Sequence, residues 1–76
     1  MAESFSFEII KRGPKLGATS SKGWTKELNQ VAWNDREPKW DIREWNEDYS
    51  KCGRGVTLTD EELAIMGSYL YDNGLA

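Results

Sequence analysis

The segment WTKELNQVAWNDREPKWDIREW, residues 24–45, contains all four tryptophans of the 76-residue chain. Two runs within it, 24–33 and 39–45, are rich in Trp, Val and Ile, which favour extended structure over helix. The polar sequence between them contains Asn34, which tolerates turn conformations, and Pro38, which keeps the preceding residue out of the helical region. The segment therefore predicts a β-hairpin made from these two runs.

The sequence before the hairpin predicts one more strand. Phe5, Phe7 and Ile9 alternate with polar residues, which is the period-2 pattern of a half-buried strand, and we place it over about residues 4–12. Glycine, proline and serine then fill residues 13–23, where we expect the chain to turn.

The sequence after the hairpin predicts a short strand and a helix. GVTL, residues 55–58, is long enough for a short fourth strand. Thr59 and Glu62 have the spacing of a capping box, and the pattern predicts a helix over about residues 60–72. Its apolar stripe, which we expect to face the sheet, contains Leu63, Met66 and Leu70.

These elements predict a single domain over residues 1–76 in the α+β class, with the order β-β-β-β-α and one helix covering one face of an antiparallel sheet. A chain of this length buries only about 60% of the surface that it exposes when unfolded, so a partner subunit would add stability. Tyr69, Leu70 and Tyr71 exceed what one sheet face needs, and we expect them to help form a homodimer seam.

The chain has one cysteine, Cys52, and no histidine. This composition provides no disulfide pair, no Cys/His cluster for zinc and no imidazole base for a nucleophile. We therefore expect no enzymatic activity, no metal and no cofactor, although a thiol chemistry at Cys52 between Lys51 and Arg54 is an alternative. With neither a signal peptide nor a membrane-spanning run, we expect a cytoplasmic protein, associated with the nucleoid if it is bacterial.

The net charge of −3 is unevenly distributed. Residues 1–58 hold all ten basic residues against nine acidic ones, whereas residues 59–76 hold four acidic residues and no basic one. Because phosphate neutralisation is the usual source of affinity for nucleic acids, the first 58 residues are compatible with such a partner and the remainder is not.

The length of the hairpin loop decides which residues share a face. A five-residue loop, 34–38, places Trp33 opposite Lys39 and leaves Leu28, Ala32, Trp40 and Ile42 on a face expected to be core. The other face then carries Trp33, Lys39, Asp41, Arg43 and Trp45. A four-residue loop exchanges Trp33 to the opposite face and remains an alternative.

Aromatic rings that alternate with cations are typical of surfaces that bind single-stranded nucleic acid, where bases stack on rings and basic side chains neutralise phosphates. The competing interpretation is structural, because tryptophans in a small β-rich domain usually pack in the core and exposed cations usually form weak surface ion pairs. A sheet face of this kind also suits a module that binds a peptide, and a stacking surface accepts RNA as well as DNA.

Three ordered motifs, KGWTKELNQVAWND (22–35), EPKWDIREW (37–45) and KCGRGVTLTDEEL (51–63), resemble the family of the transcriptional coactivator positive cofactor four, and most closely its bacterial YdbC-type members. The resemblance covers most of the chain. It implies a strongly curved four-stranded antiparallel sheet with a C-terminal helix, forming a homodimer that binds single-stranded DNA on the sheet face in transcription, replication or repair.

The resemblance also assigns roles to residues. It implies that Trp33 and Trp45 stack bases and that Arg43 contacts the strand. Basic residues near the second and fourth strands correspond in kind to Lys22 and Lys26, and to Lys51 and Arg54. The alternating pattern of the hairpin adds Lys39 as a phosphate contact. Trp24 is added as a third ring, although strict alternation sends Trp24 and Lys26 to the helix side, unless the strand bulges near Leu28 or that end extends beyond the helix. The complete predicted site is Lys22, Trp24, Lys26, Trp33, Lys39, Arg43, Trp45, Lys51 and Arg54.

Overall fold

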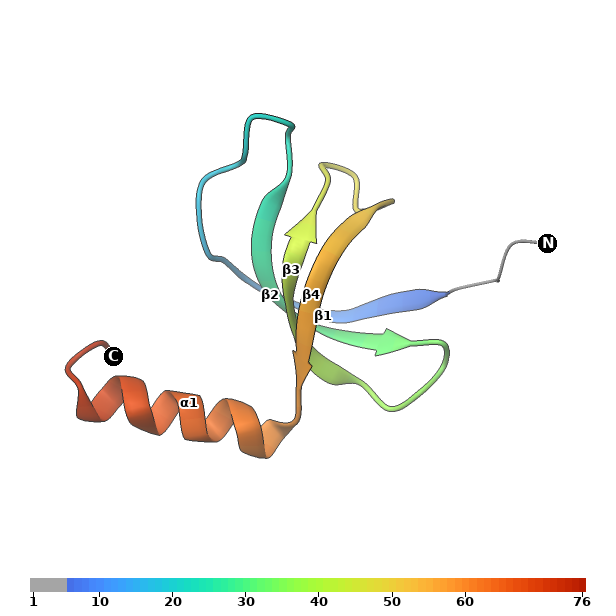
Figure 1. The fold of residues 1–76 in the computed structure, drawn as a ribbon. Helices are drawn as coiled ribbons and strands as arrows, with labels where there is room; N and C mark the ends of the chain where they lie inside the picture. Colours follow the sequence, from blue (N-terminus) through green and yellow to red (C-terminus); the bar gives the residue numbers. More distant parts are fainter. Residues whose placement is uncertain (1–5) are drawn as a thin grey trace.

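A computed structural model describes residues 6–76, and its fold is an open antiparallel sheet followed by one helix (Figure 1). The sheet has the order β1-β2-β3-β4, so every neighbouring pair is also consecutive in the chain. The predicted beginning of the first strand, at residues 4 and 5, lies outside the described residues. The elements are β1 (Phe7–Lys15), β2 (Thr25–Trp33), β3 (Lys39–Trp45), β4 (Cys52–Leu58) and α1 (Asp60–Asp72).

The predicted hairpin is present, but neither of the two loop lengths considered from the sequence is right. Val31, and not Trp33, lies opposite Lys39, so the pairing of β2 with β3 is displaced by two residues from the five-residue loop. Trp33 pairs instead with Phe7 of β1, and Asn34 turns the chain there with a φ of 51°. A shift of the pairing by two residues leaves every side chain on the same face of the sheet. The residues that share each face were therefore predicted correctly from the five-residue loop.

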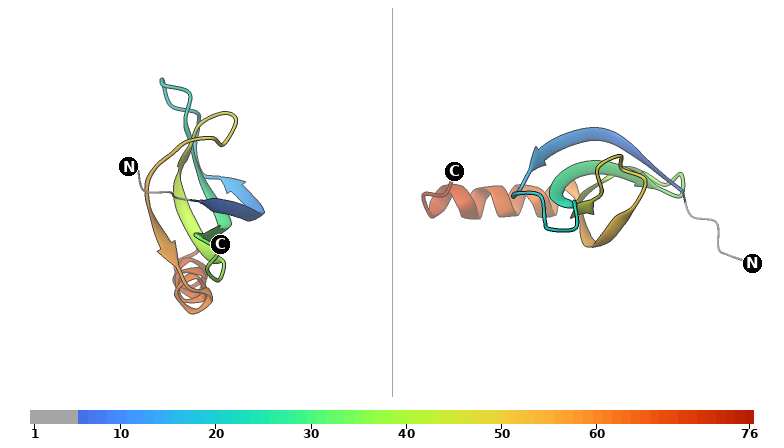
Figure 2. Two further views of the ribbon diagram at one scale, coloured as in Figure 1. Left: turned by 90° about the vertical axis from the view of Figure 1, so that its right-hand side faces the viewer. Right: turned by 90° about the horizontal axis from the view of Figure 1, so that it is seen from above.

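The sheet is curled around one of its faces (Figure 2). Irregular pairing between Ile9 and Lys11 in β1, and at the beginning of β4, adds bends where strands otherwise run straight. Gly13 permits the tightest approach, because a Cβ at this position would collide with the backbone oxygen of Leu28 on β2. The concave side of the curl is called the inner face below, and the convex side the outer face.

The inner face is the buried one, which corrects the prediction of which face forms the core. Val31 and Trp45 are buried there, together with the polar residues Asn29 and Asp41. On the outer face, Leu28, Ala32, Trp40 and Ile42, which were predicted to be core, are only half-buried. The reason is geometric: the curled sheet excludes water from its own concave side, whereas within residues 6–76 only the first turn of α1 reaches the convex side, where Asp60 accepts a hydrogen bond from the Trp40 indole.

Helix α1 begins as predicted and packs differently from the prediction. The Thr59 hydroxyl accepts a hydrogen bond from the Glu62 amide at 3.1 Å, and the Glu62 carboxylate accepts one from the Thr59 amide at 2.8 Å. The helix then extends away from the sheet, and none of its residues is buried (Figure 1). Met66 and Leu70, expected to face the sheet, are 40% and 38% exposed.

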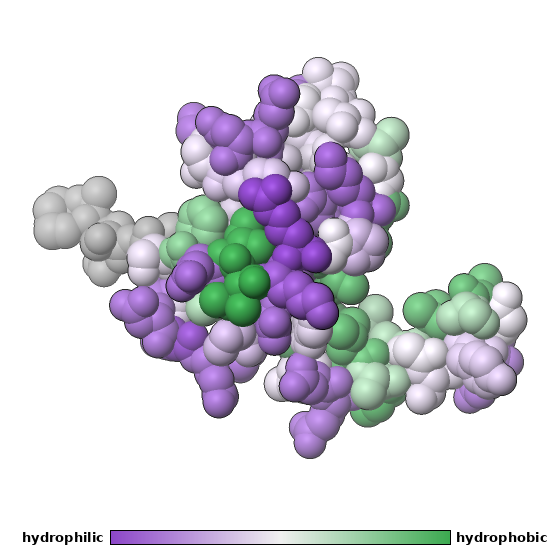
Figure 3. Space-filling view, turned by 180° about the vertical axis from the view of Figure 1, so that it is seen from behind, coloured by the Kyte–Doolittle hydropathy of each residue, from purple (hydrophilic) through white to green (hydrophobic). Residues whose placement is uncertain are grey.

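The protomer is elongated for its size. Its principal extents are 48 × 32 × 18 Å and its radius of gyration is 13.8 Å, against about 11 Å for a compact domain of this length. Seen from behind, apolar residues are visible both on the sheet and along the projecting helix (Figure 3). Exposed apolar residues of these two regions include Val56 on β4 and Ile65, Met66, Tyr69, Leu70 and Tyr71 on α1.

Candidate nucleic-acid interface

Four aromatic rings gather on the inner face. Trp33 and Trp45 stack with their ring centroids 6.3 Å apart and their planes 16° apart. Phe7 of β1 lies 5.7 Å from Trp33 and 5.1 Å from Trp45, and Tyr49 from the β3–β4 loop lies 5.8 Å from Trp45. We call these four residues the inner aromatic cluster; separations of this kind are favourable for aromatic pairs.

Arg43 covers one ring of this cluster. Its guanidinium carbon lies 4.5 Å from the centroid of Trp33, in the geometry of a cation–π contact. The Nε of Arg43 donates to Asp41 at 2.6 Å, and one terminal nitrogen donates to the Gly53 carbonyl at 3.3 Å. Gly55 on β4 leaves the space that this side chain occupies, because a Cβ there would collide with Arg43.

The charge of Arg43 is secured by its partner. Burial disfavours the charged guanidinium, but the hydrogen bond and the charge of Asp41 outweigh this effect and raise the pKa of Arg43. Asp41 itself is 0% exposed, and its Oδ2 has no hydrogen-bond partner among the described residues. Arg43 is therefore a cation held over an indole ring by a fully buried carboxylate.

A second cation and a second buried carboxylate lie at Tyr49. The guanidinium carbon of Arg12 stands 4.2 Å from the centre of the Tyr49 ring. The Tyr49 hydroxyl donates to Glu27 at 2.6 Å, and the Asn29 amide donates to the other Glu27 oxygen at 3.2 Å. The hydrogen bond to Glu27, followed by burial, raises the pKa of Tyr49.

Trp45 is not the solvent-exposed ring that the sequence predicted, since only 1% of its surface is exposed. It lies beneath the other rings of the inner aromatic cluster and supports them. Trp33 is half-buried, and Arg43 is half-buried beside it. Trp33 and Arg43, which were predicted to share a face, therefore lie in contact on the inner face, and Trp45 belongs to the core beneath them.

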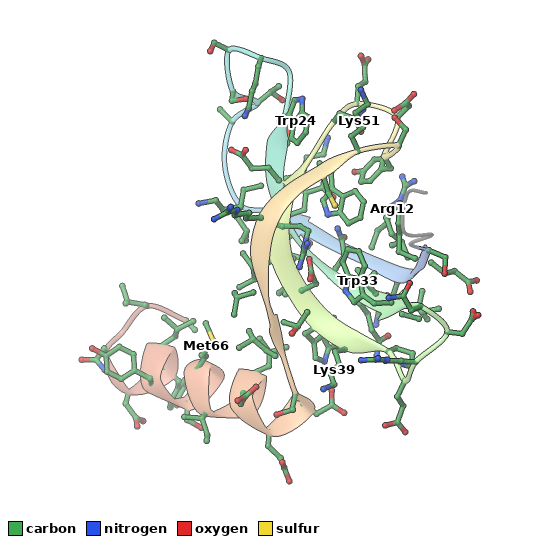
Figure 4. The ribbon with its side chains drawn as sticks, turned by 45° about the vertical axis from the view of Figure 1, so that its right-hand side comes forward. Arg12, Trp24, Trp33, Lys39, Lys51 and Met66 are labelled. Atoms are coloured by element: carbon green, nitrogen blue, oxygen red, sulfur yellow. The ribbon has the colours of Figure 1, made fainter. Side chains whose placement is uncertain are left out.

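The remaining predicted residues do not form one continuous track (Figure 4). Lys26 lies opposite Glu44, on the outer face. Trp24 directly precedes β2, at the same end of the sheet as Lys26. The ammonium nitrogen of Lys22 lies 4.9 Å from the centre of the Trp24 ring. Lys51 is exposed in the β3–β4 loop.

Lys39 lies at the opposite end of the sheet. It borders a hollow together with Glu37, Asp60 and Glu61. A phosphate bound there would also meet these carboxylates, which makes Lys39 a poor phosphate contact. Arg54 on β4 is exposed and makes no ion pair within the range 6–76.

The sequence reasoning missed Phe7, Arg12 and Tyr49. Phe7 was predicted only as a strand residue. Its spacing of two residues from Ile9 did place the two side chains on the same face. No local signal brings Arg12 of β1 onto Tyr49 of a loop 37 positions later, because that contact depends on the curl of the sheet.

The described part of the chain contains no cluster of metal-ligating side chains and no disulfide. From residue 6 to residue 76, no group of three or more His, Cys, Asp or Glu side chains is placed to hold a metal ion. Cys52 is half-buried beside Arg43 and has no disulfide. Within the same residues, no helix is long and apolar enough to cross a membrane.

Comparison with known proteins identifies a relative of this chain. No protein-family model matches the chain. An uncharacterized protein of Treponema pallidum (strain Nichols) is 41% identical over 68 residues, which is 90% of this chain and 79% of that protein.

Proposed function

We propose that this chain, which belongs to the same family as the uncharacterized Treponema pallidum protein, binds single-stranded DNA as a homodimer. The proposal makes the inner face the binding surface. The motifs of the chain also resemble those of the positive cofactor four family, and this resemblance implies the same activity.

The contact between Arg43 and Trp33 carries the proposal. The Arg43 guanidinium, whose carbon lies 4.5 Å from the ring centre of Trp33, offers a planar cation beside an aromatic ring. Such a pair attracts both a base, through stacking, and a phosphate, through charge. Asp41 holds the guanidinium by its Nε at 2.6 Å, so little ordering cost remains when a strand binds.

The Tyr49 and Arg12 pair repeats this arrangement on the same face. Two ring–guanidinium pairs, both in contact with Trp45 through their rings, suit successive bases of one strand. Each stacked base contributes about 1–3 kcal/mol without strong sequence preference. Lys51 in the β3–β4 loop and Arg54 on β4 are exposed and would neutralise phosphates beyond the rings.

The homodimer is supported by the unpartnered apolar surfaces. A 13-residue helix without tertiary packing is marginal in water, yet α1 contains no buried residue. Within residues 6–76, no other element buries the row of Leu28, Ile42 and Val56 on the outer face. A second copy that packs its helix and outer face against these residues would bury both, and would leave the two inner faces pointing outward.

Fluorescence titration tests this function. Single-stranded dT and U 20-mers and a matched duplex are added to the protein, and tryptophan emission is followed at several salt concentrations. The proposal predicts quenching by the dT 20-mer, weaker binding at high salt, and little response to the duplex. Quenching by U at least as strong as by dT would assign the surface to RNA. Absence of quenching by both would remove nucleic-acid binding, and would favour the alternative of a peptide-binding module.

A further inference from the structure

A cavity of about 350 Å³ opens between the two loops at one end of the sheet. One wall comes from the β1–β2 loop and the beginning of β2, with Thr19 and Thr25. The other wall comes from the end of β3 and the loop after it, with Asn46 and Tyr49. The two loops stand side by side in Figure 1, and Trp45 joins the cavity to the inner aromatic cluster.

The cavity is lined by a buried carboxylate, that of Glu27, which is 3% exposed. Within residues 6–76 its hydrogen-bond partners are two neutral donors, the Tyr49 hydroxyl and the Asn29 amide, and it makes no ion pair there. A carboxylate has about four acceptor positions, so two remain for further donors. Burying a charged group is costly unless donors compensate for it, and a ligand with N–H groups would supply them.

The other lining groups suit a flat polar ring. The hydroxyls of Thr19 and Thr25 lie 2.8 Å apart and can each donate or accept. Lys15 also lines the cavity and provides a cation for an anionic group attached to the ring. The aromatic side chains of Trp45 and Tyr49 and the carboxylate of Glu47 also line the cavity. The volume of the cavity is larger than that of a single nucleobase and smaller than that of a stack of several nucleobases.

We infer that this cavity receives one unstacked nucleobase of the bound strand and selects bases that carry an exocyclic amino group, through donation to Glu27. The inference deepens the proposed function and rests on it. Uracil and thymine present a carbonyl where cytosine presents an amino group, and a carbonyl oxygen facing a buried carboxylate is repelled.

The experiment compares dC and dU 12-mers, whose bases differ at C4, an amino group in cytosine and a carbonyl in uracil, and at N3, an acceptor in cytosine and an N–H donor in uracil. Affinities are measured at pH 8 for the wild-type protein, for Glu27→Gln and for Glu44→Gln, a control carboxylate on the outer face. The wild type is expected to bind dC about tenfold more tightly than dU, the size of effect of one charge-assisted hydrogen bond. Glu27→Gln should abolish this preference, because an amide can donate or accept, and Glu44→Gln should retain it.

The outcomes separate the two proposals. Equal affinity of the wild-type protein for dC and dU overturns the base-selecting cavity and leaves single-strand binding in place. No binding of any oligomer overturns both. If Glu27→Gln does not fold, the amide resonances of Thr25 and Tyr49 are followed in the wild-type protein with deoxycytidine and deoxyuridine monophosphates. Larger shifts with the cytidine nucleotide support the cavity, and equal or absent shifts refute it.

Discussion

Replacing Arg43 with alanine should destabilise the fold far more than an ordinary surface substitution. Asp41 is 0% exposed and its one ion pair in the described chain is with Arg43, at 2.6 Å. Removing one member of a buried pair leaves an uncompensated charge, which typically costs about 3–5 kcal/mol. This is a large part of the about 5–15 kcal/mol that stabilises a natural domain.

A double-mutant cycle isolates the cause of that loss. Asp41→Asn removes the buried charge and retains an oxygen that accepts from Arg43, so the double variant Arg43→Ala/Asp41→Asn should recover at least about half of the loss. Unfolding in urea, followed by tryptophan fluorescence at one fixed protein concentration, measures all four proteins. Arg54→Ala is the control and should change stability by less than about 0.5 kcal/mol. A loss below about 1 kcal/mol for Arg43→Ala, or no recovery in the double variant, would refute the buried-pair reasoning.

The remaining predictions concern the seam, the packing of β4 and the response to alkali. Met66→Asp should convert a dimer into a monomer in sedimentation at micromolar concentration, whereas Ser68→Asp should not; an unchanged dimer in both would contradict the seam. Gly55→Ala should lower the thermal midpoint by several degrees because its methyl group meets a side chain of β3, and Gly17→Ala, with open space around it, should leave the midpoint nearly unchanged. Since the folded pKa of Tyr49 is raised above its ordinary value of 10.0, its stabilising hydrogen bond is present below about pH 10 and is lost as the pH rises through the folded pKa. Tyr49→Phe should therefore reduce the fall in stability between about pH 9 and 11, and an identical fall in both proteins would speak against this role.

The elements of the fold were predictable because their signals are local. Thr59 and Glu62 form their capping box from residues three positions apart, and Asn34 and Asp35 adopt the left-handed turn conformation that their side chains tolerate. The third strand, Lys39–Trp45, has the predicted bounds. The fourth is three residues longer than expected, because Cys52, Gly53 and Arg54 also belong to it.

The burial of the two faces was not predictable in the same way. Alternation groups Trp33 with Arg43 and Trp45, and it groups Leu28 with Ile42, but it cannot say which group faces water. That choice follows from the curl of the sheet, which depends on contacts such as Gly13 with Leu28, 15 positions apart. The prediction that α1 covers the sheet was wrong for a related reason. The helical spacing of apolar residues indicates an apolar stripe, but it does not indicate which surface the stripe packs against.

The separation of the predicted cations has the same origin. Lys39 and Arg43 alternate along one strand, yet the beginning of α1 brings Asp60 and Glu61 beside Lys39 and leaves Arg43 stacked on its indole. Conversely, Arg12 lies in a strand that contributed no site residue from the sequence. A candidate site chosen by spacing along one hairpin therefore omits the cations that β1 and the loops bring to it.

Nuclear magnetic resonance of the four indole N–H groups tests the inner-face assignment most directly. A single-stranded 12-mer is titrated into protein labelled with ¹⁵N, and each indole signal is followed. The account predicts that the Trp33 signal shifts or broadens with increasing strand, while that of Trp40, which donates to Asp60 at 2.7 Å on the outer side, stays in place. A shift of Trp40 with Trp33 unchanged would place the strand on the opposite face, and no shift in any indole would contradict single-strand binding itself.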